Sequence, residues 1–137
     1  MAKRPRPERE RDEQNRVAAY CRNLGYLCTC ALAERLDLPH RRKQAWAMGY
    51  SPGTPDMFIF EPRYGKLGLA IEMKRASGNT RVSPKQQEWL TELEQRGWVA
   101  RVCYGSEEAI ALIESYMSGP LPTLTGADAV TGHTSAP

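Results

Sequence analysis

The sequence predicts an α/β domain in which a mixed β-sheet is flanked by helices. Apolar residues recur three and four residues apart in several segments, a spacing typical of helices. Short apolar runs between these segments predict strands. In the second half, a strand over 68–74, a helix over 84–96 and a strand over 98–104 form a β-α-β unit, which implies a parallel strand pair with a right-handed crossover. The predicted order of elements is α-β-α-β-β-α-β-α.

Length and composition fit one compact globular domain. The chain has 137 residues, of which 41% are hydrophobic and 26% charged, ordinary values for such a domain. No apolar run approaches the roughly 18 residues of a membrane span, and no apolar signal segment is present, so we expect a cytoplasmic protein without a membrane partner. The net charge of +3 permits a nucleic-acid partner without requiring one. We expect residues 1–8 to form a basic flexible arm and residues 118–137 a disordered tail.

The first helix is predicted over 10–23 and ends at Gly25. Its apolar stripe consists of Val17, Tyr20, Cys21 and Leu24. Glu13 lies on the same stripe, which leaves two interpretations. It is either a partly exposed first-turn carboxylate that favours the helix dipole, or a carboxylate that points inward toward a functional site. A strand is predicted next, over 26–32.

A dense basic cluster begins the next predicted helix, a short one over 40–48. The cluster is His40-Arg41-Arg42-Lys43, and apolar residues follow it toward the helix end. One interpretation is a solvated charged turn. The other is an edge that contacts phosphate groups, which we favour because Gly53 and Pro55 lead from this cluster directly into the central strands.

The two central strands carry the acidic chemistry of the chain. One begins at Asp56, directly after Pro55, and the other covers 69–74. Because side chains alternate between the faces of a strand, Glu72 and Lys74 share one face with Ala70. The other face, with Leu69, Ile71 and Met73, suits a core. If the strands are neighbours, two carboxylates and an ammonium group share one small pocket, and carboxylate oxygens are ligands suited to Mg²⁺ or Mn²⁺.

The helix over 84–96 has a strong start signal, Ser83-Pro84-Lys85-Gln86, with Ser at the N-cap, Pro at the first position and Gln at the third. Gln86 has two interpretations that do not exclude each other. It closes the capping box through its side chain, or it holds a water or phosphate in the acidic pocket. The last helix is expected to be capped by Ser106, with Ile110, Ile113 and Met117 along one side.

The four cysteines are Cys21, Cys28, Cys30 and Cys103, without a CxxC pair. We interpret them as free cysteines that behave as small buried hydrophobic residues. A zinc site that combines some of them with His40 is the alternative.

Several motifs together resemble one nuclease family. Pro55-Asp56 with Glu72-Met73-Lys74 is similar to the PD-(D/E)xK nuclease signature. The stretch from Gly49 to Asp56 and the Ser83-Pro84-Lys85-Gln86-Gln87 helix start, followed by Gly97, resemble motifs of its VRR-NUC (virus-type replication-repair nuclease) branch. Glu13-Gln14 resembles that family's N-terminal helix motif. The resemblance covers roughly residues 9–117.

The resemblance implies a restriction-endonuclease-like core and metal-dependent hydrolysis of DNA phosphodiester bonds. It implies that Asp56, Glu72 and the Met73 carbonyl bind Mg²⁺ or Mn²⁺, that Lys74 acts electrostatically, and that Gln86 and Glu13 belong to the active site. It also implies homodimers that act on branched DNA such as four-way (Holliday) junctions. We expect exposed cations near the pocket to contact phosphate, namely Arg41, Arg42, Lys43, Arg75, Arg81 and Lys85.

Two non-enzymatic functions compete with the nuclease. The first is a nucleic-acid-binding module with an inactive pocket, against which the joint presence of Asp56, Glu72 and Lys74 argues. The second is a structural subunit in which Glu72 and Lys74 form a surface pair.

Overall fold

The computed structural model of the chain describes residues 9–31, 39–77 and 81–122. The predictions for the arm over 1–8, for Leu32 at the end of the first strand and for the tail beyond Pro122 lie outside these residues. The elements follow in the order α1 (Glu10–Asn23), β1 (Cys28–Cys30), α2 (Pro39–Ala47), β2 (Met57–Ile59), β3 (Leu69–Lys74), α3 (Pro84–Gln95), β4 (Val99–Tyr104) and α4 (Ser106–Ser118). This order confirms the predicted succession of helices and strands.

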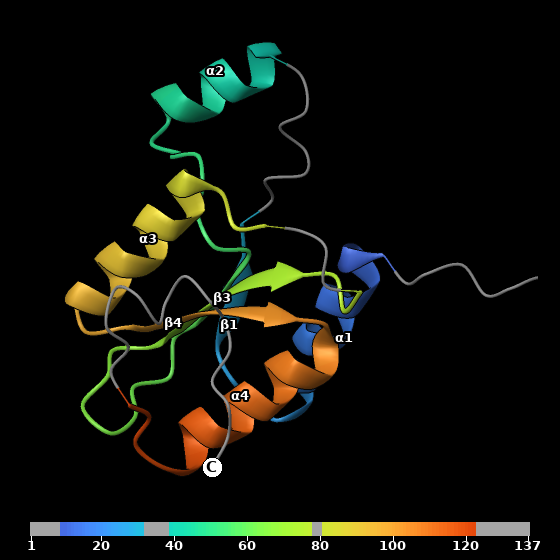
Figure 1. Cartoon of the computed structure of the whole chain (residues 1–137), viewed down its shortest axis with the longest axis vertical. Coiled ribbons are helices and arrows are strands. Elements are labelled where there is room, and N and C mark those ends of the chain that lie inside the picture. The colour runs from blue at the N-terminus through green and yellow to red at the C-terminus, as the bar shows by residue number, and fades with distance from the viewer. Residues whose placement is uncertain (1–8, 32–38, 78–80, 123–137) are drawn as a thin grey trace, which may run out of the picture.

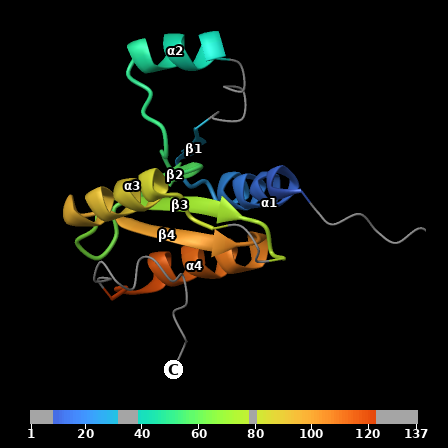
Figure 2. The same ribbon diagram turned by 45° about the horizontal axis from the view of Figure 1, so that its top comes forward.

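The four strands form one mixed sheet in the order β1-β2-β3-β4. β1 pairs with β2 and β2 with β3 in antiparallel fashion, whereas β3 and β4 are parallel. The parallel pair is the predicted β-α-β unit, with α3 as its crossover. Figure 2 shows α3 on one face of the β3–β4 pair and α4 on the other. The predicted α/β fold with a mixed sheet flanked by helices is therefore confirmed (Figure 1).

Alternation along β3 divides the core into two layers. All six residues of the strand are buried. Leu69, Ile71 and Met73 belong to the larger hydrophobic cluster, which α1 and α4 complete. Ala70 belongs to the smaller cluster on the opposite face, with Leu90 of α3. Because Glu72 and Lys74 share the parity of Ala70, they are directed to the α3 face of the sheet.

Helix α3 begins as its sequence predicts. The Ser83 side chain accepts a hydrogen bond from the Gln86 amide, the Gln86 side chain accepts one from the Ser83 amide, and Pro84 occupies the first turn. Leu90 and Leu93 are the buried residues of the helix. This capping box fixes the first turn of α3 against the site described below.

Several element boundaries differ from the prediction. β1 covers only Cys28–Cys30, and β2 begins at Met57, so Asp56 lies just outside the strand. Ser106 is not the N-cap of α4. Gly105 holds that position, with φ of +88°, and Ser106 is a buried first helical residue. The glycine can adopt a positive φ at which the chain turns sharply from β4 into α4, and Ser106 cannot do so without strain.

The buried face of α4 is also displaced from the predicted one. Ser106, Ala109, Ile113 and Tyr116 are the buried residues, whereas Ile110 and Met117 are only half-buried. The α4 helix includes Ser118, and Leu121 packs against the larger cluster. The described structure thus extends into the range that was predicted as a disordered tail. Within the ranges that the structure describes, no helix is both long and apolar enough to cross a membrane.

Candidate active site

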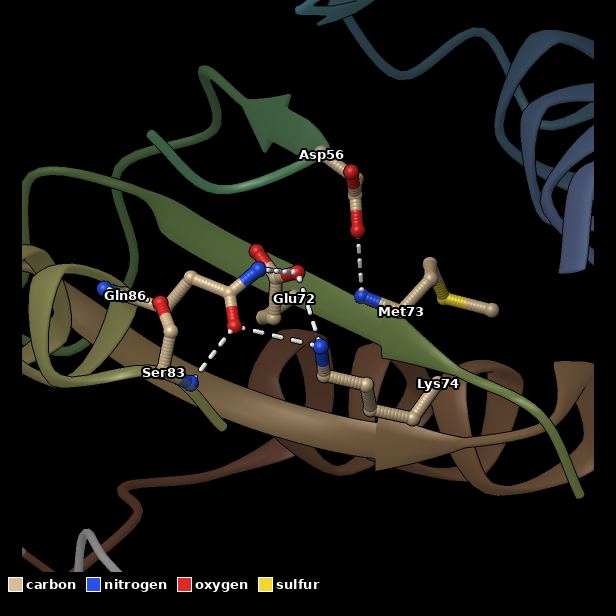
Figure 3. A network of polar contacts seen from close by, with 6 residues as sticks. All are labelled: Asp56, Glu72, Met73, Lys74, Ser83 and Gln86. Carbon is tan, nitrogen blue, oxygen red and sulfur yellow. Dashed lines mark hydrogen bonds and ion pairs between the residues drawn. The ribbon is translucent and has the colours of Figure 1, made fainter. Parts of the chain in front are cut away.

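Asp56 is held at the entrance of β2 by its backbone and its side chain. Pro55 before it is fully buried, and the Asp56 carbonyl accepts a hydrogen bond of 2.9 Å from the Ala31 amide. The Oδ2 atom of Asp56 accepts a hydrogen bond of 2.8 Å from the Met73 amide of β3 (Figure 3). The carboxylate is therefore fixed beside Met73, which lies between Glu72 and Lys74 on β3.

Gly53 brings the loop before Asp56 onto the first turn of α3. Its φ is +89°, and a Cβ atom at this position would lie 2.6 Å from the Lys85 carbonyl carbon and 2.8 Å from the Gln86 amide nitrogen. Only glycine permits so close an approach of two backbones. The carboxylate of Asp56 and the amide of Gln86 thus come from segments that touch each other at Gly53.

Glu72, Lys74 and Gln86 form one polar network on the α3 face of the sheet (Figure 3). The Gln86 Nε2 atom donates to Glu72 Oε1 at 2.8 Å, and Lys74 Nζ donates to Gln86 Oε1 at 3.1 Å. The Lys74 Nζ atom also lies 3.6 Å from Glu72 Oε1. Glu72 and Lys74 are only 3% and 5% exposed, so they do not form the surface pair that a purely structural subunit would show.

Gln86 serves the helix and the network with different atoms. Its Oε1 accepts from both the Ser83 amide and Lys74, while its Nε2 remains free to donate to Glu72. The capping box of Gln86 is therefore confirmed, and the same rotamer contacts Glu72 and Lys74, while a water or phosphate held by Gln86 stays a prediction. The helix start positions the side chain, and the side chain positions the lysine and the glutamate.

Glu72 is a buried acid whose negative charge is only partly offset by the neighbouring Lys74 ammonium group. Burial, followed by repulsion from the Asp56 carboxylate, raises the pKa of Glu72 to about 8, although the Lys74 ammonium group opposes this shift. Its second oxygen, Oε2, is buried and no donor group of the folded chain hydrogen-bonds to it. The Asp56 carboxyl group is close enough to hydrogen-bond with Glu72, but only while one of the two acids is protonated. A buried polar atom without a partner is costly and is a frequent sign of an ion or ligand site.

The residues present fit a divalent cation that prefers oxygen ligands. Asp56 and Glu72 supply two carboxylates, and a cation beside them would partner Oε2 and remove the repulsion that raises the Glu72 pKa. The described part of the chain contains no group of three or more His, Cys, Asp or Glu side chains that could hold a metal. Two carboxylates suffice for Mg²⁺, which usually keeps several water ligands. The hydrogen bond from Met73 to Asp56 involves its amide, and its carbonyl as a ligand stays a prediction.

Glu13 points inward, as one of the two interpretations proposed. It is 5% exposed, and its Oε2 accepts a hydrogen bond of 3.4 Å from the Ala76 amide. A Cβ atom added to Gly105 would lie 2.9 Å from Glu13 Oε1. Glu13 therefore joins α1 to the chain just beyond the ends of β3 and β4, and it does not belong to the hydrogen-bonded network of Glu72, Lys74 and Gln86.

The predicted phosphate contacts lie on three separate segments. Each of the six side chains is exposed, as a DNA contact requires. They are Arg41, Arg42 and Lys43 of α2, Arg75 directly after β3, Arg81 before α3, and Lys85 in the first turn of α3. Arg75 also lines a hollow of about 440 Å³ with residues 9–11 at the start of α1.

Among the residues that the structure describes, the cysteines and His40 form no group of three that could hold zinc. Cys21 and Cys103 are buried, Cys28 is half-buried and Cys30 is exposed, and all are free. Burial raises the pKa of the Cys21 thiol to about 12, so it stays a protonated, apolar core group.

The family model of the VRR-NUC domain matches residues 7–107, well over half of the chain. The chain belongs to the VRR-NUC family. A solved structure described as a VRR_NUC domain protein is similar to it with a TM-score of 0.67 and 25% sequence identity, over 79% of this chain and 87% of the other. A search among curated proteins found no match. VRR-NUC is a nuclease-type family.

The VRR-NUC chain also contains a residue near the site to which the sequence analysis gave no function. The pKa of Tyr50 is raised by burial and then by the carboxylates of Asp56 and Glu72, so its hydroxyl lies within their electrostatic reach. Tyr50 belongs to the Gly49–Asp56 stretch that carries the family resemblance. The influence of the two carboxylates on Tyr50 depends on how the 49–56 loop folds, and periodicity gives no signal for it.

Proposed function

We propose that this VRR-NUC chain is a metal-dependent nuclease that hydrolyses DNA phosphodiester bonds. One observation supports the proposal most: the buried Glu72 and Lys74 form a network with the half-buried Gln86 beside the Asp56 carboxylate, and no donor group hydrogen-bonds to Glu72 Oε2. Burying these charges costs stability, and a cation site offsets that cost. Membership in a nuclease-type family agrees with this chemistry.

In this proposal Asp56 and Glu72, with the Met73 carbonyl, hold Mg²⁺ or Mn²⁺. When bound, such an ion lowers the pKa of a coordinated water and stabilises negative charge on phosphate oxygens. Gln86 holds Glu72 Oε1, so the other oxygen of that carboxylate is left for the ion. The Met73 amide holds Asp56 Oδ2 and so restricts the rotation of that carboxylate.

Lys74 is proposed to stabilise charge during the reaction. Its ammonium group has three donors, and Gln86 Oε1 occupies one of them. The Glu72 carboxylate would attract the group by charge once metal binding has displaced the Glu72 proton. A remaining donor can orient the attacking water or contact the oxyanion that develops on the phosphate. A donor fixed before the reaction in a water-poor site contributes more than the same donor in bulk water.

We propose branched DNA, including four-way junctions, as the substrate, and a homodimer as the acting species. Resolution of a junction requires two nicks in strands of equal polarity, and a two-fold dimer presents two equivalent sites. The exposed cations of α2, Arg75, Arg81 and Lys85 are proposed to contact the phosphates.

A cleavage assay tests the proposal. A panel of end-labelled linear duplex, flap, single-stranded and four-way-junction DNA is incubated with Mg²⁺ or with EDTA. We expect cleavage only with Mg²⁺, and none from Asp56→Asn or Glu72→Gln, which replace a carboxylate at nearly constant volume. Lys74→Met is expected to reduce the rate by about 10²- to 10³-fold, the usual loss for one electrostatic donor.

Circular dichroism and thermal melting of each variant show whether the fold is kept. Wild-type cleavage by all three folded variants contradicts the assignment of this site. DNA binding in EDTA without any cleavage in Mg²⁺ favours the inactive binding module.

A further inference from the structure

Helix α2 stands apart from the layers of the fold. Ala45 is half-buried, and every other residue of the helix is exposed. Figures 1 and 2 both show α2 away from the sheet and from the other helices. Helices shorter than about 12–15 residues are marginal in water unless one face packs against something. We therefore expect the nine-residue helix α2 to be stabilised by a binding partner outside the described fold.

The composition of α2 indicates what that partner is. The helix carries Arg41, Arg42 and Lys43 and no acidic residue. Trp46 is 69% exposed, an unusual exposure for the largest apolar side chain. Arg42 precedes it by four residues and Lys43 by three, so both cations lie on the side of the helix that carries the indole ring. A helix with cations only is complementary to a polyanion.

We propose that α2 binds DNA where a base is unstacked, with the Trp46 ring stacked on that base and with Arg42 and Lys43 on the adjacent phosphates. Aromatic side chains beside cations form the stacking platforms of proteins that bind single strands. In an intact duplex both faces of each internal base are covered by neighbouring bases. The indole face therefore finds a partner only at a branch, a flap, a gap or a strand end. Trp46 becomes a specificity-determining residue for such DNA. This inference rests on the proposed function because it takes DNA as the substrate.

The chain itself limits how far the contacted base lies from the cleaved bond. Trp46 and Asp56 are ten residues apart (56 − 46). A fully extended chain spans at most about 3.6 Å per residue, so their backbones lie within about 36 Å of each other. At about 3.4 Å per nucleotide along a strand, this corresponds to about ten nucleotides. We expect cleavage within about ten nucleotides of the branch point for this reason.

Equilibrium binding in EDTA tests the inference without any cleavage. The probes are a fluorescently labelled blunt duplex, the same duplex with a single-stranded flap, and the single strand alone. We expect Trp46→Ala to weaken binding of the flap and the single strand by about 5- to 150-fold, and to leave duplex binding unchanged. Trp46→Phe is expected to retain most of the affinity because it keeps an aromatic face. Met48→Ala is the matched control: Met48 is 88% exposed and follows the same helix, but it has no aromatic ring.

A fluorescent base analogue, 2-aminopurine, at the branch point gives a second readout. We expect the wild type and Trp46→Phe to quench its fluorescence by stacking, and Trp46→Ala not to do so. Two outcomes overturn the inference: an equal loss of affinity for all three probes, or no loss at all in Trp46→Ala. If that variant binds DNA normally but changes from dimer to monomer in light scattering, α2 docks on a second copy of this chain instead.

The cleavage assay and this binding assay fail independently. Specific binding in EDTA without cleavage in Mg²⁺ contradicts the nuclease proposal and leaves the Trp46 inference standing. Cleavage in Mg²⁺ together with normal flap binding by Trp46→Ala contradicts the Trp46 inference and leaves the nuclease proposal standing.

Discussion

Among the single residues of the site, Glu72 makes the metal-free protein sensitive to pH. Its pKa in the folded chain is about 8, above the ordinary value of 4.5, because burial and the Asp56 carboxylate disfavour its charge. The folded state then holds a proton that the unfolded state releases at lower pH. The stabilising contribution of this proton is complete below about pH 4.5 and is lost as the pH rises through about 8.

We therefore predict that the free energy of unfolding in EDTA falls between pH 5 and pH 9 through this residue. Urea denaturation across that range measures it. Glu72→Gln, which is neutral at every pH, is expected to remove this part of the decline. The same slope in the wild type and in Glu72→Gln contradicts the assigned pKa.

Sequence reasoning placed some site residues and not others, for physical reasons. Alternation along one strand suffices to place Glu72 and Lys74 on the face of Ala70, opposite the core residues Ile71 and Met73. That rule is local and needs no tertiary information. The Ala76 amide beside Glu13, and the proximity of Tyr50 to the two carboxylates, depend on how distant segments pack.

Between elements, the junction of the 53–56 loop with α3 positions the two halves of the site. We predict that Gly53→Ala destabilises the protein and slows cleavage. Its φ of +89° costs a side chain about 1–2 kcal/mol, and the new Cβ would also collide with the backbone of Lys85 and Gln86. Gly49→Ala is the matched control, because Gly49 has φ of +106° but nothing within 4 Å of the added atom. Equal melting temperatures and equal rates for the two variants contradict the proposed packing at Gly53.

Two substitutions at the start of α3 separate the capping of the helix from the contact of Gln86 with Glu72. Ser83→Ala removes the cap, and we predict a loss of about 0.5–2 kcal/mol in stability with most of the activity retained. Gln86→Glu keeps the capping box, in which Glu and Gln are equivalent, but it places a carboxylate where Glu72 accepts a hydrogen bond. We predict near-normal stability and a large loss of cleavage for this variant. Thermal melting and initial rates measured on both proteins test the separation.

The sequence predicted the capping box and the parallel crossover because each depends on a few neighbouring residues. The sequence prediction failed at the N-cap of α4, because serine is at least as good an N-cap residue as the neighbouring glycine. The choice of Gly105 depends on the tight turn that follows β4, where an added Cβ would meet Ala76 and Glu13. The isolation of α2 is likewise a tertiary fact, because no local pattern along residues 39–47 shows whether Trp46 packs against the rest of the chain.

For the molecule as a whole, the net charge of +3 is small, so the proposed DNA binding depends on local cations. We predict that binding in EDTA weakens with salt, and that replacing Arg75 and Lys85 by Ala reduces the slope of log K against log salt by about 0.9 for each lost contact. The matched control is Arg63→Ala, because Arg63 pairs with Glu61 in the loop between β2 and β3. An unchanged slope in the double variant shows that these two cations do not contact DNA.

A divalent cation at Asp56 and Glu72 is the assumption on which the nuclease proposal depends most. Titration of Mn²⁺ into the protein at pH 7, followed by calorimetry in buffers of different ionisation enthalpy, tests it directly. Because the pKa of Glu72 is about 8, its proton is still bound at pH 7, and metal binding must displace it. We predict saturable binding with the release of nearly one proton, and weaker binding without that release in Glu72→Gln. Identical titrations of the two proteins, or no binding by the wild type, would contradict the site.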